Sequence, residues 1–238
     1  MHDESMIEMT MGGQRLRLSH SPGVFAPNTT TRLLFDAALP VNGLHVLDLG
    51  CGIGPVAIAA AFAGAESVTA VDVMPEACSL TIKNAQLNGV GNKIQVLRGN
   101  VLRDVGNRKF DLIISDISGI ADTVARLSPW YPPSIPTGGS GGGDLAIEVI
   151  ESACQHLNPG GRLVFPVIGL SQAPLIEASA RRVFGESLAV LLEKDVPFHR
   201  DLYAHREVLA ELKEQGLIDY TERGSRLCWK LQVIEARV

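Results

Sequence analysis

The stretch VLDLGCGIGP, residues 46–55, decides the fold of this chain. It starts as a short apolar run, passes through glycines at positions 50, 52 and 54, and leads into an alanine-rich segment that ends near residue 65. We interpret it as a buried strand, a tight turn and a helix, because glycine adopts positive φ and lets the backbone approach a ligand closely. The free amides at the start of the helix favour a carboxylate or a phosphate.

The same alternation of strand and helix continues along most of the chain. Strands that are apolar throughout, instead of alternating with polar residues, are buried on both faces and indicate a parallel sheet covered by helices. The first strand of this series is expected at residues 45–50, and the others at residues 67–73, 93–99, 110–116, 162–168, 187–196 and 226–236. The order predicts an α/β fold with a doubly wound, mostly parallel sheet, preceded by a hairpin at residues 7–18.

Composition narrows the possible partners. The chain has 238 residues, of which 46% are hydrophobic, and a net charge of −5, so we expect one domain (1–238) and neither a membrane nor a general nucleic-acid partner. The four cysteines form no CxxC pair, and no apolar run reaches the about 20 residues of a membrane span. We therefore expect a cytoplasmic protein. No metal site is expected, because His199 and His205 do not share a helical face.

Two aspartates lie at the carboxyl ends of the first two strands of the predicted sheet. Asp48 comes two residues before Gly50, where its carboxylate can face a cationic group. Asp72 ends the next strand, 22 residues after Gly50, and suits an acid that accepts hydrogen bonds from both ribose hydroxyls. Position 55 is a proline where the dinucleotide fingerprint needs its third glycine. Together with the charge of Asp48, this favours S-adenosyl-L-methionine over a dinucleotide.

At these residues the sequence resembles the class I S-adenosylmethionine-dependent methyltransferases. The stretch 46–55 is similar to their first motif, which would bind the cofactor through Asp48 and the turn glycines Gly50, Gly52 and Gly54. AVDV, residues 70–73, is similar to the segment that carries their ribose-binding acid, and this implies Asp72 and Val73 as cofactor contacts. The resemblance also implies a Rossmann-like sheet of seven strands with an antiparallel last strand, and Asn100 and Val101 near the adenine.

The segment PGVFAPNTTTRLL, residues 22–34, is similar to that of the small-domain methyltransferases that modify ribosomal proteins, release factors and ribosomal RNA. By that resemblance Phe25, Thr30 and Thr31 would border the methionine end of the cofactor, and residues 1–40, including the hairpin, would form an N-terminal lid. Several of these subfamilies have Asn-Pro-Pro-Tyr where this chain has residues 115–118, Ser-Asp-Ile-Ser. The difference puts methylation of glutamine or nucleobase nitrogens in doubt.

The end of the fourth strand and the loop after it supply candidates for the acceptor site. Asp116 is a candidate cofactor contact and a candidate general base, with a simple turn cap as its alternative. Ser118 and Tyr131 complete the candidate catalytic residues. Trp130 and Tyr131 lie in a loop rich in proline and glycine, where they either cap a substrate or pin the loop to the core.

The helical insert at residues 197–225 shows one apolar stripe. Packing against the sheet edge is favoured for it over substrate or dimer contact. The stripe consists of Leu202, Val208, Leu209, Leu212 and Leu217.

We expect a methyltransferase acting on a protein side chain or a small molecule, with dimerisation left open. Three alternatives remain. One is an enzyme that cyclises or cleaves the sulfonium compound and releases methylthioadenosine. Another is a ribosomal RNA methyltransferase, since a nucleic-acid substrate is disfavoured but not excluded. The third is a cofactor-retaining module that activates a partner enzyme.

Overall fold

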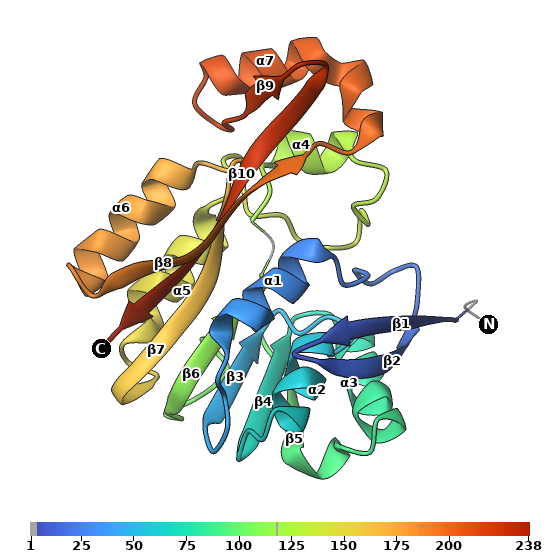
Figure 1. Ribbon diagram of the computed structural model, residues 1–238, viewed down its shortest axis with the longest axis vertical. Helices are drawn as coiled ribbons and strands as arrows, with labels where there is room; N and C mark the ends of the chain where they lie inside the picture. Colours follow the sequence, from blue (N-terminus) through green and yellow to red (C-terminus); the bar gives the residue numbers. More distant parts are fainter. Residues whose placement is uncertain (1–3, 118) are drawn as a thin grey trace.

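A single large sheet organises the computed structural model, which describes residues 4–117 and 119–238 (Figure 1). Its main strands are β3 (His45–Leu49), β4 (Ser67–Asp72), β5 (Ile94–Arg98), β6 (Phe110–Ser115), β7 (Leu157–Ile168), β8 (Leu188–Pro197) and β10 (Arg226–Arg237). Their order across the sheet is β5-β4-β3-β6-β7-β10-β8, and β9 (Thr221–Arg223) pairs with β10. The pairs from β5 to β7 are parallel, whereas β10 is antiparallel to both β7 and β8. The predicted fold class, with its antiparallel last strand, is confirmed.

Helices cover both faces of this sheet. Consecutive residues of β3 point to opposite sides, so Val46 joins one apolar core and Leu47 the other. The first core includes residues of α1 (Thr29–Ala38), α2 (Pro55–Phe62) and α3 (Pro75–Leu87). The second includes residues of α5 (Asp144–Ala153) and α6 (Ala173–Phe184). The short elements η1 (Gly91–Lys93) and α4 (Asp122–Leu127) lie in connections, and α4 was not predicted from the sequence.

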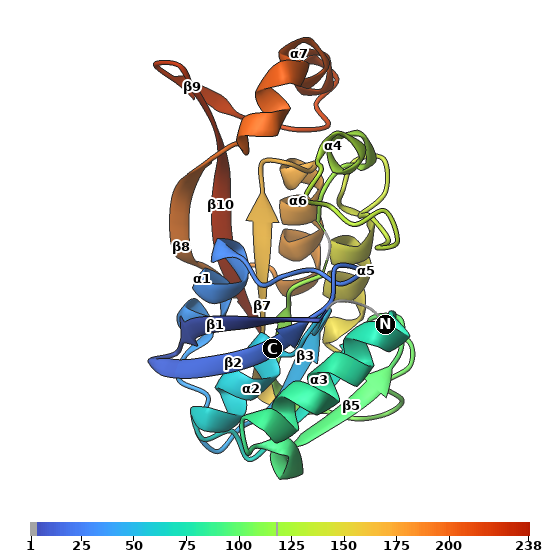
Figure 2. The same ribbon diagram turned by 90° about the vertical axis from the view of Figure 1, so that its right-hand side faces the viewer.

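The predicted N-terminal hairpin forms from β1 (Ser5–Met11) and β2 (Gln14–His20). It lies across α2 and α3 (Figure 2), and its residues Met11, Leu16 and Leu18 are buried in the first core. The strand ends are instead approached by the segment that follows the hairpin, residues 24–31. Of residues 1–40, which were expected to form a lid, this connecting segment is thus the part that lines the cavity, because the apolar face of the hairpin packs against the helices.

Strand β7 begins earlier than the predicted residue 162. Phe110 of β6 pairs with Leu157, whereas Leu112 pairs with Arg162, so residues 158–161 form an irregularity inside the strand. Gly160, with φ of +76°, allows the chain to turn there and rejoin the ladder. Because the buried Leu157 already belongs to the sheet, α5 ends at Ala153 and not at the predicted residue 157.

The insert continues the upper ends of β8 and β10, which extend beyond the parallel part of the sheet (Figure 1). It contains η2 (Arg200–His205), α7 (Arg206–Glu214) and β9. Three residues of the predicted stripe, Leu202, Leu209 and Leu212, are buried together with Trp229 and residues of α4. The insert thus has its own small core above the strand ends. In the described part of the chain, no helix is long and apolar enough to cross a membrane.

Candidate functional site

The glycine turn after β3 brings three strand ends close together. Gly50 has φ of +75°, and a Cβ atom there would lie 2.9 Å from the backbone oxygen of Asp116, so only glycine lets β3 approach the end of β6 this closely. Gly54 has φ of +89°, and its Cβ would lie 2.9 Å from Cγ2 of Thr81 in α3. Gly54 therefore permits close packing between α2 and α3.

A cavity of about 830 Å³ opens at the carboxyl ends of the parallel strands. This is the edge where ligands bind in open α/β sheets. Eleven of the predicted site residues line it: Phe25, Thr30, Thr31, Gly50, Gly52, Asp72, Val73, Asn100, Val101, Asp116 and Tyr131. Asp48 and Gly54 are not part of the lining, and the predicted Ser118 lies outside the described residues.

Asp72 is oriented by two backbone amides. Its Oδ2 accepts a hydrogen bond from the amide of Gly52 at 2.9 Å, and its Oδ1 accepts one from the amide of Met74, also at 2.9 Å. A carboxylate oxygen has a second lone pair, so each of these atoms remains able to accept from a ligand hydroxyl. Burial raises the pKa of this carboxyl.

Asp48 lies beneath the glycine turn and does not face the cavity. Its side chain points to the α2 side of the sheet, where Oδ2 accepts a hydrogen bond from the amide of Ala57 at 3.0 Å and caps the helix. Its Oδ1 is buried and has no hydrogen-bond partner among the described residues. Burial, followed by the negative charge of Asp116, raises the pKa of Asp48 well above its usual range. In the structure Asp48 thus caps α2 and makes no contact with the cavity.

Asp116 lies at the end of β6 on the cavity wall. Burial raises its pKa to about 6, and a side-chain hydrogen bond from Thr31 of α1 partly offsets that rise. The carboxyl therefore titrates close to neutral pH. It lines the cavity together with Asp72.

Three acids surround the turn, and the two that line the cavity, Asp72 and Asp116, give it a negative potential when they are ionised. Asp48 is affected by the charges of both Asp116 and Asp72. Across residues 4–117 and 119–238, no lysine, arginine or histidine forms an ion pair with any of the three. Such a site favours a cationic ligand and disfavours a phosphate. The searched residues also contain no group of His, Cys, Asp and Glu able to hold a metal ion.

The end of β5 forms another part of the wall. Asn100 is fixed by its amide, which donates to Oδ2 of Asp104 at 2.8 Å. Val101 adopts φ of +44°, a conformation that is unusual for a β-branched residue. This turn places Asn100 and Val101 in the cavity lining, across from the half-exposed Val73.

Aromatic rings join the segment 24–31 to the loop after β6. The ring of Phe25 lies 4.8 Å from that of Tyr131 in an edge-on arrangement and 6.4 Å from that of Trp130. The hydroxyl of Tyr131 donates to the backbone oxygen of Pro136 at 2.9 Å. The rings therefore pin the loop, which was one of the two alternatives, and they also line the cavity.

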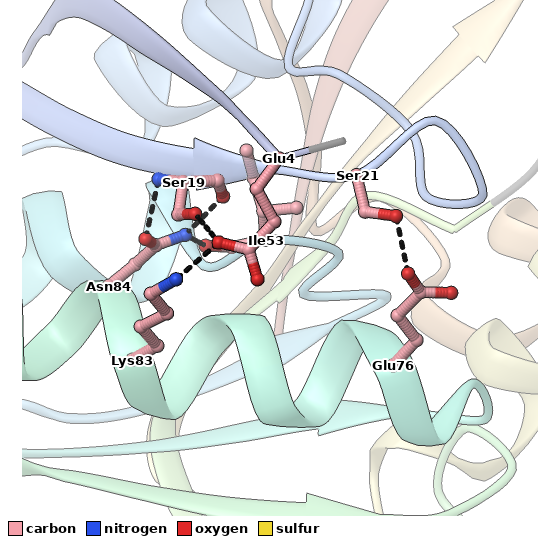
Figure 3. Close-up of polar contacts among 7 residues, drawn as sticks. All are labelled: Glu4, Ser19, Ser21, Ile53, Glu76, Lys83 and Asn84. Atoms are coloured by element: carbon pink, nitrogen blue, oxygen red, sulfur yellow. Dashed lines mark hydrogen bonds and ion pairs between the residues drawn. The ribbon is translucent and has the colours of Figure 1, made fainter. Parts of the chain in front are cut away.

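Helix α3 holds both the hairpin and the glycine turn (Figure 3). The buried Asn84 accepts from the amide of Ser19 at 2.7 Å, and its Nδ2 donates to the backbone oxygens of Ser19 at 2.9 Å and of Ile53 at 2.8 Å. One turn away, the Thr81 hydroxyl donates to the backbone oxygen of Gly52 at 2.9 Å. The roles of Asn84 and Thr81 were not predicted from the sequence, because they depend on tertiary contacts.

The sequence also did not predict that the insert would form part of the cavity wall. Phe198, Leu202 and Trp229 line it together with Leu170 at the end of β7. The aromatic residue directly after Pro197, where β8 ends, was the one signal in the sequence that this segment turns back toward the strand ends.

Comparison with known proteins identifies relatives of this chain. A family model described as ribosomal protein L11 methyltransferase matches residues 28–142. The release factor glutamine methyltransferase of Gloeobacter violaceus is 32% identical over 177 residues, which cover 70% of this chain and 62% of that protein. The chain is related to the class I S-adenosylmethionine-dependent methyltransferases. A second relative, the ribosomal protein L11 methyltransferase of Pelotomaculum thermopropionicum, is 44% identical over 97 residues, which cover 41% of this chain and 30% of that protein.

Solved structures of methyltransferases share the fold. The ribosomal protein L11 methylase of Lactobacillus delbrueckii subsp. bulgaricus is 24% identical, with a TM-score of 0.55 over 90% of this chain and 82% of that one. The 16S rRNA N2 G1207 methyltransferase of T. thermophilus, solved with AdoMet and guanosine, is 19% identical, with a TM-score of 0.65 over 98% of this chain and 50% of that one. The resemblance found in the sequence is confirmed. The chain spans less than two thirds of the length of the curated relatives described above.

Proposed function

We propose that this chain binds S-adenosylmethionine at the glycine turn and transfers its methyl group to a nucleophile of a protein side chain or a small molecule. The observation that carries the proposal is the pair of acids that line the cavity at this turn, Asp72 and Asp116, which have no cationic partner in the described part of the chain. S-adenosylmethionine has a cationic ammonium and a cationic sulfonium group but no phosphate, and it therefore complements this potential.

Each part of the cofactor meets a suitable group on the cavity wall. The two oxygens of Asp72 accept hydrogen bonds from the ribose hydroxyls in addition to the amides of Gly52 and Met74. The Asn100 side chain accepts from the adenine amino group, and Val73 and Val101 contact the ring. The remaining proposed contacts with the cofactor are made by Phe25, Thr30, Thr31, Gly50 and Asp116.

Chemistry at this site depends mostly on position. When bound, the cofactor supplies an electrophilic methyl group. The aromatic loop and the segment 24–31 shield the reacting atoms from water and hold the nucleophile in line. With a pKa of about 6, Asp116 is largely ionised at neutral pH, and its carboxylate accepts a proton or a hydrogen bond from the nucleophile.

Two features bear on the acceptor. The relatives named above act on ribosomal protein L11 and on a release factor, which supports a protein side chain. Residues 115–118 lack the Asn-Pro-Pro-Tyr of the amide-methylating subfamilies, and the net charge of −5 disfavours RNA.

The four cysteines are all unpaired, which supports the proposed cytoplasmic location.

The test combines calorimetry with product analysis. We expect S-adenosylmethionine and S-adenosylhomocysteine to bind with micromolar affinity, and turnover with a cytoplasmic extract to release S-adenosylhomocysteine. Release of methylthioadenosine would instead indicate cleavage or cyclisation of the sulfonium compound. The proposal is wrong if neither compound binds, or if Asp72→Ala leaves binding of both unchanged.

A further inference from the structure

The cavity continues past the groups that complement the cofactor. Beyond Asp116 it is bounded by Leu170, Phe198, Leu202 and Trp229, which we call the distal arm. These four side chains are apolar or aromatic and are almost completely buried. Leu170 follows β7 and Trp229 belongs to β10, whereas Phe198 and Leu202 belong to the start of the insert. The distal arm is therefore formed by the last third of the chain.

One residue of the cavity lining, Trp130, has a buried polar atom without a partner. The indole nitrogen Nε1 of Trp130 is buried and forms no hydrogen bond with any of the described residues. Leaving a buried donor unpaired is unfavourable. A ligand oxygen that reaches this N–H and accepts from it would remove that penalty.

The position of the indole is set by its neighbours. The ring of Trp130 packs 6.4 Å from that of Phe25 and 6.1 Å from that of Tyr131. The backbone oxygen of Phe25 lies 4.0 Å from the position a Cβ atom would take on Gly52. Phe25 is therefore next to the glycine turn, and Trp130 packs near Phe25.

The charges at the two ends of the cavity differ in sign. Asp72 and Asp116 line the cofactor end, whereas His199 and Arg200 line the end formed by the insert. His199 is paired with Asp201 at 3.0 Å. Within the described residues the Arg200 side chain forms no ion pair or hydrogen bond, so its positive charge is available to an oxygen-bearing group.

We propose that the distal arm binds the apolar part of the methyl acceptor and that the indole N–H of Trp130 donates a hydrogen bond to a carbonyl or carboxylate oxygen of that acceptor. This inference rests on the proposed methyltransferase function. It defines the acceptor as an apolar group that ends in an oxygen acceptor, and it makes Trp130 a specificity-determining residue.

Indole NMR tests this directly, because the chain contains only two tryptophans. Protein labelled with ¹⁵N-tryptophan gives two indole signals, which Trp130→Phe and Trp229→Phe assign. The protein is first saturated with S-adenosylhomocysteine. Hexanamide, hexanoate and hexylamine are then added separately as probes, because they share an apolar chain and only the first two carry an oxygen acceptor.

We expect hexanamide and hexanoate, but not hexylamine, to move the Trp130 indole proton downfield. Trp130→Phe should weaken hexanamide binding about fivefold and leave the affinity for S-adenosylhomocysteine unchanged. Trp229→Phe retains an aromatic ring in the distal arm, so the Trp130 signal should still move in the same direction when hexanamide is added. Thermal melts of both variants confirm that they are folded.

Three outcomes overturn the inference. If S-adenosylhomocysteine alone produces the full shift, the indole serves the cofactor. If hexylamine shifts the signal as much as hexanamide does, no oxygen is being recognised. If no probe shifts it up to its solubility limit, the arm does not bind such groups. In each case S-adenosylhomocysteine still binds, whereas its failure to bind would contradict the proposed function itself.

Discussion

The side chain of Thr31 hydrogen-bonds the carboxyl of Asp116 and joins the first turns of α1 to the end of β6. The two residues are far apart in the sequence, yet together they form one wall of the cavity. The bond favours the ionised form of Asp116, whereas burial favours the neutral form, and burial prevails. The charge of this wall therefore changes in the range where enzymes are usually assayed.

The affinity for S-adenosylmethionine should rise between about pH 5 and pH 7. A cationic ligand binds the ionised carboxylate better, and Asp116, with a pKa of about 6, loses its proton as the pH increases through that value. Calorimetry across this range measures the effect. Asp116→Asn should remove the step near pH 6, and an unchanged pH profile in that variant would contradict the assignment of the step to Asp116.

Thr31→Val should move that step to higher pH. The variant keeps the shape of the buried side chain but removes the hydroxyl that lowers the pKa of Asp116. We expect the midpoint of the binding profile to rise by about one pH unit. Thr69→Val, in β4 and outside the cavity lining, is the matched control and should leave the midpoint in place. Equal midpoints in the two variants would show that Thr31 does not hold Asp116.

Asp72→Asn should weaken the binding of S-adenosylhomocysteine at least about tenfold at pH 7. Its amide group presents a donor where one carboxylate oxygen accepts from the Gly52 or Met74 amide, so the acceptors for the ribose are disturbed. Asp111→Asn, in β6 and also bonded to a backbone amide, provides the control outside the cavity lining. Similar affinities for these two variants would remove the ribose role of Asp72.

The amino-acid sequence predicts the local parts of this site well and its tertiary parts poorly. The turn of residues 46–55 and Asp72 depend on strand, turn and helix signals within about 30 residues, and the structure brings both to one cavity. Asp48 was expected to face the ligand, but side chains alternate along β3 and its own points toward α2. The position of Trp229 depends on a long antiparallel pairing late in the chain, which local patterns do not specify.

Asn84→Ala should reduce both stability and cofactor affinity. The substitution removes three hydrogen bonds of a fully buried side chain and leaves groups of Ser19 and Ile53 unpaired, which we expect to lower the free energy of unfolding by about 3 kcal/mol. Because one bond holds the glycine turn, S-adenosylhomocysteine should also bind more weakly to the folded variant. Denaturant unfolding and calorimetry measure the two effects.

Lys83→Ala is the matched control on the same helix. Lys83 forms an exposed ion pair with Glu4 of the hairpin and touches neither Ser19 nor the turn through a hydrogen bond (Figure 3). We expect unfolding and cofactor affinity to stay close to those of the parent. If Asn84→Ala loses stability but keeps the parent's affinity, Asn84 supports the fold without positioning the turn.

A crystal structure with S-adenosylhomocysteine is the strongest single test of the proposed cofactor site. We expect the ribose hydroxyls to lie within hydrogen-bond distance of both carboxylate oxygens of Asp72, and the homocysteine part to lie between the glycine turn and the Thr31–Asp116 pair. A nucleoside bound elsewhere in the cavity, or a turn closed by its own side chains, would contradict it.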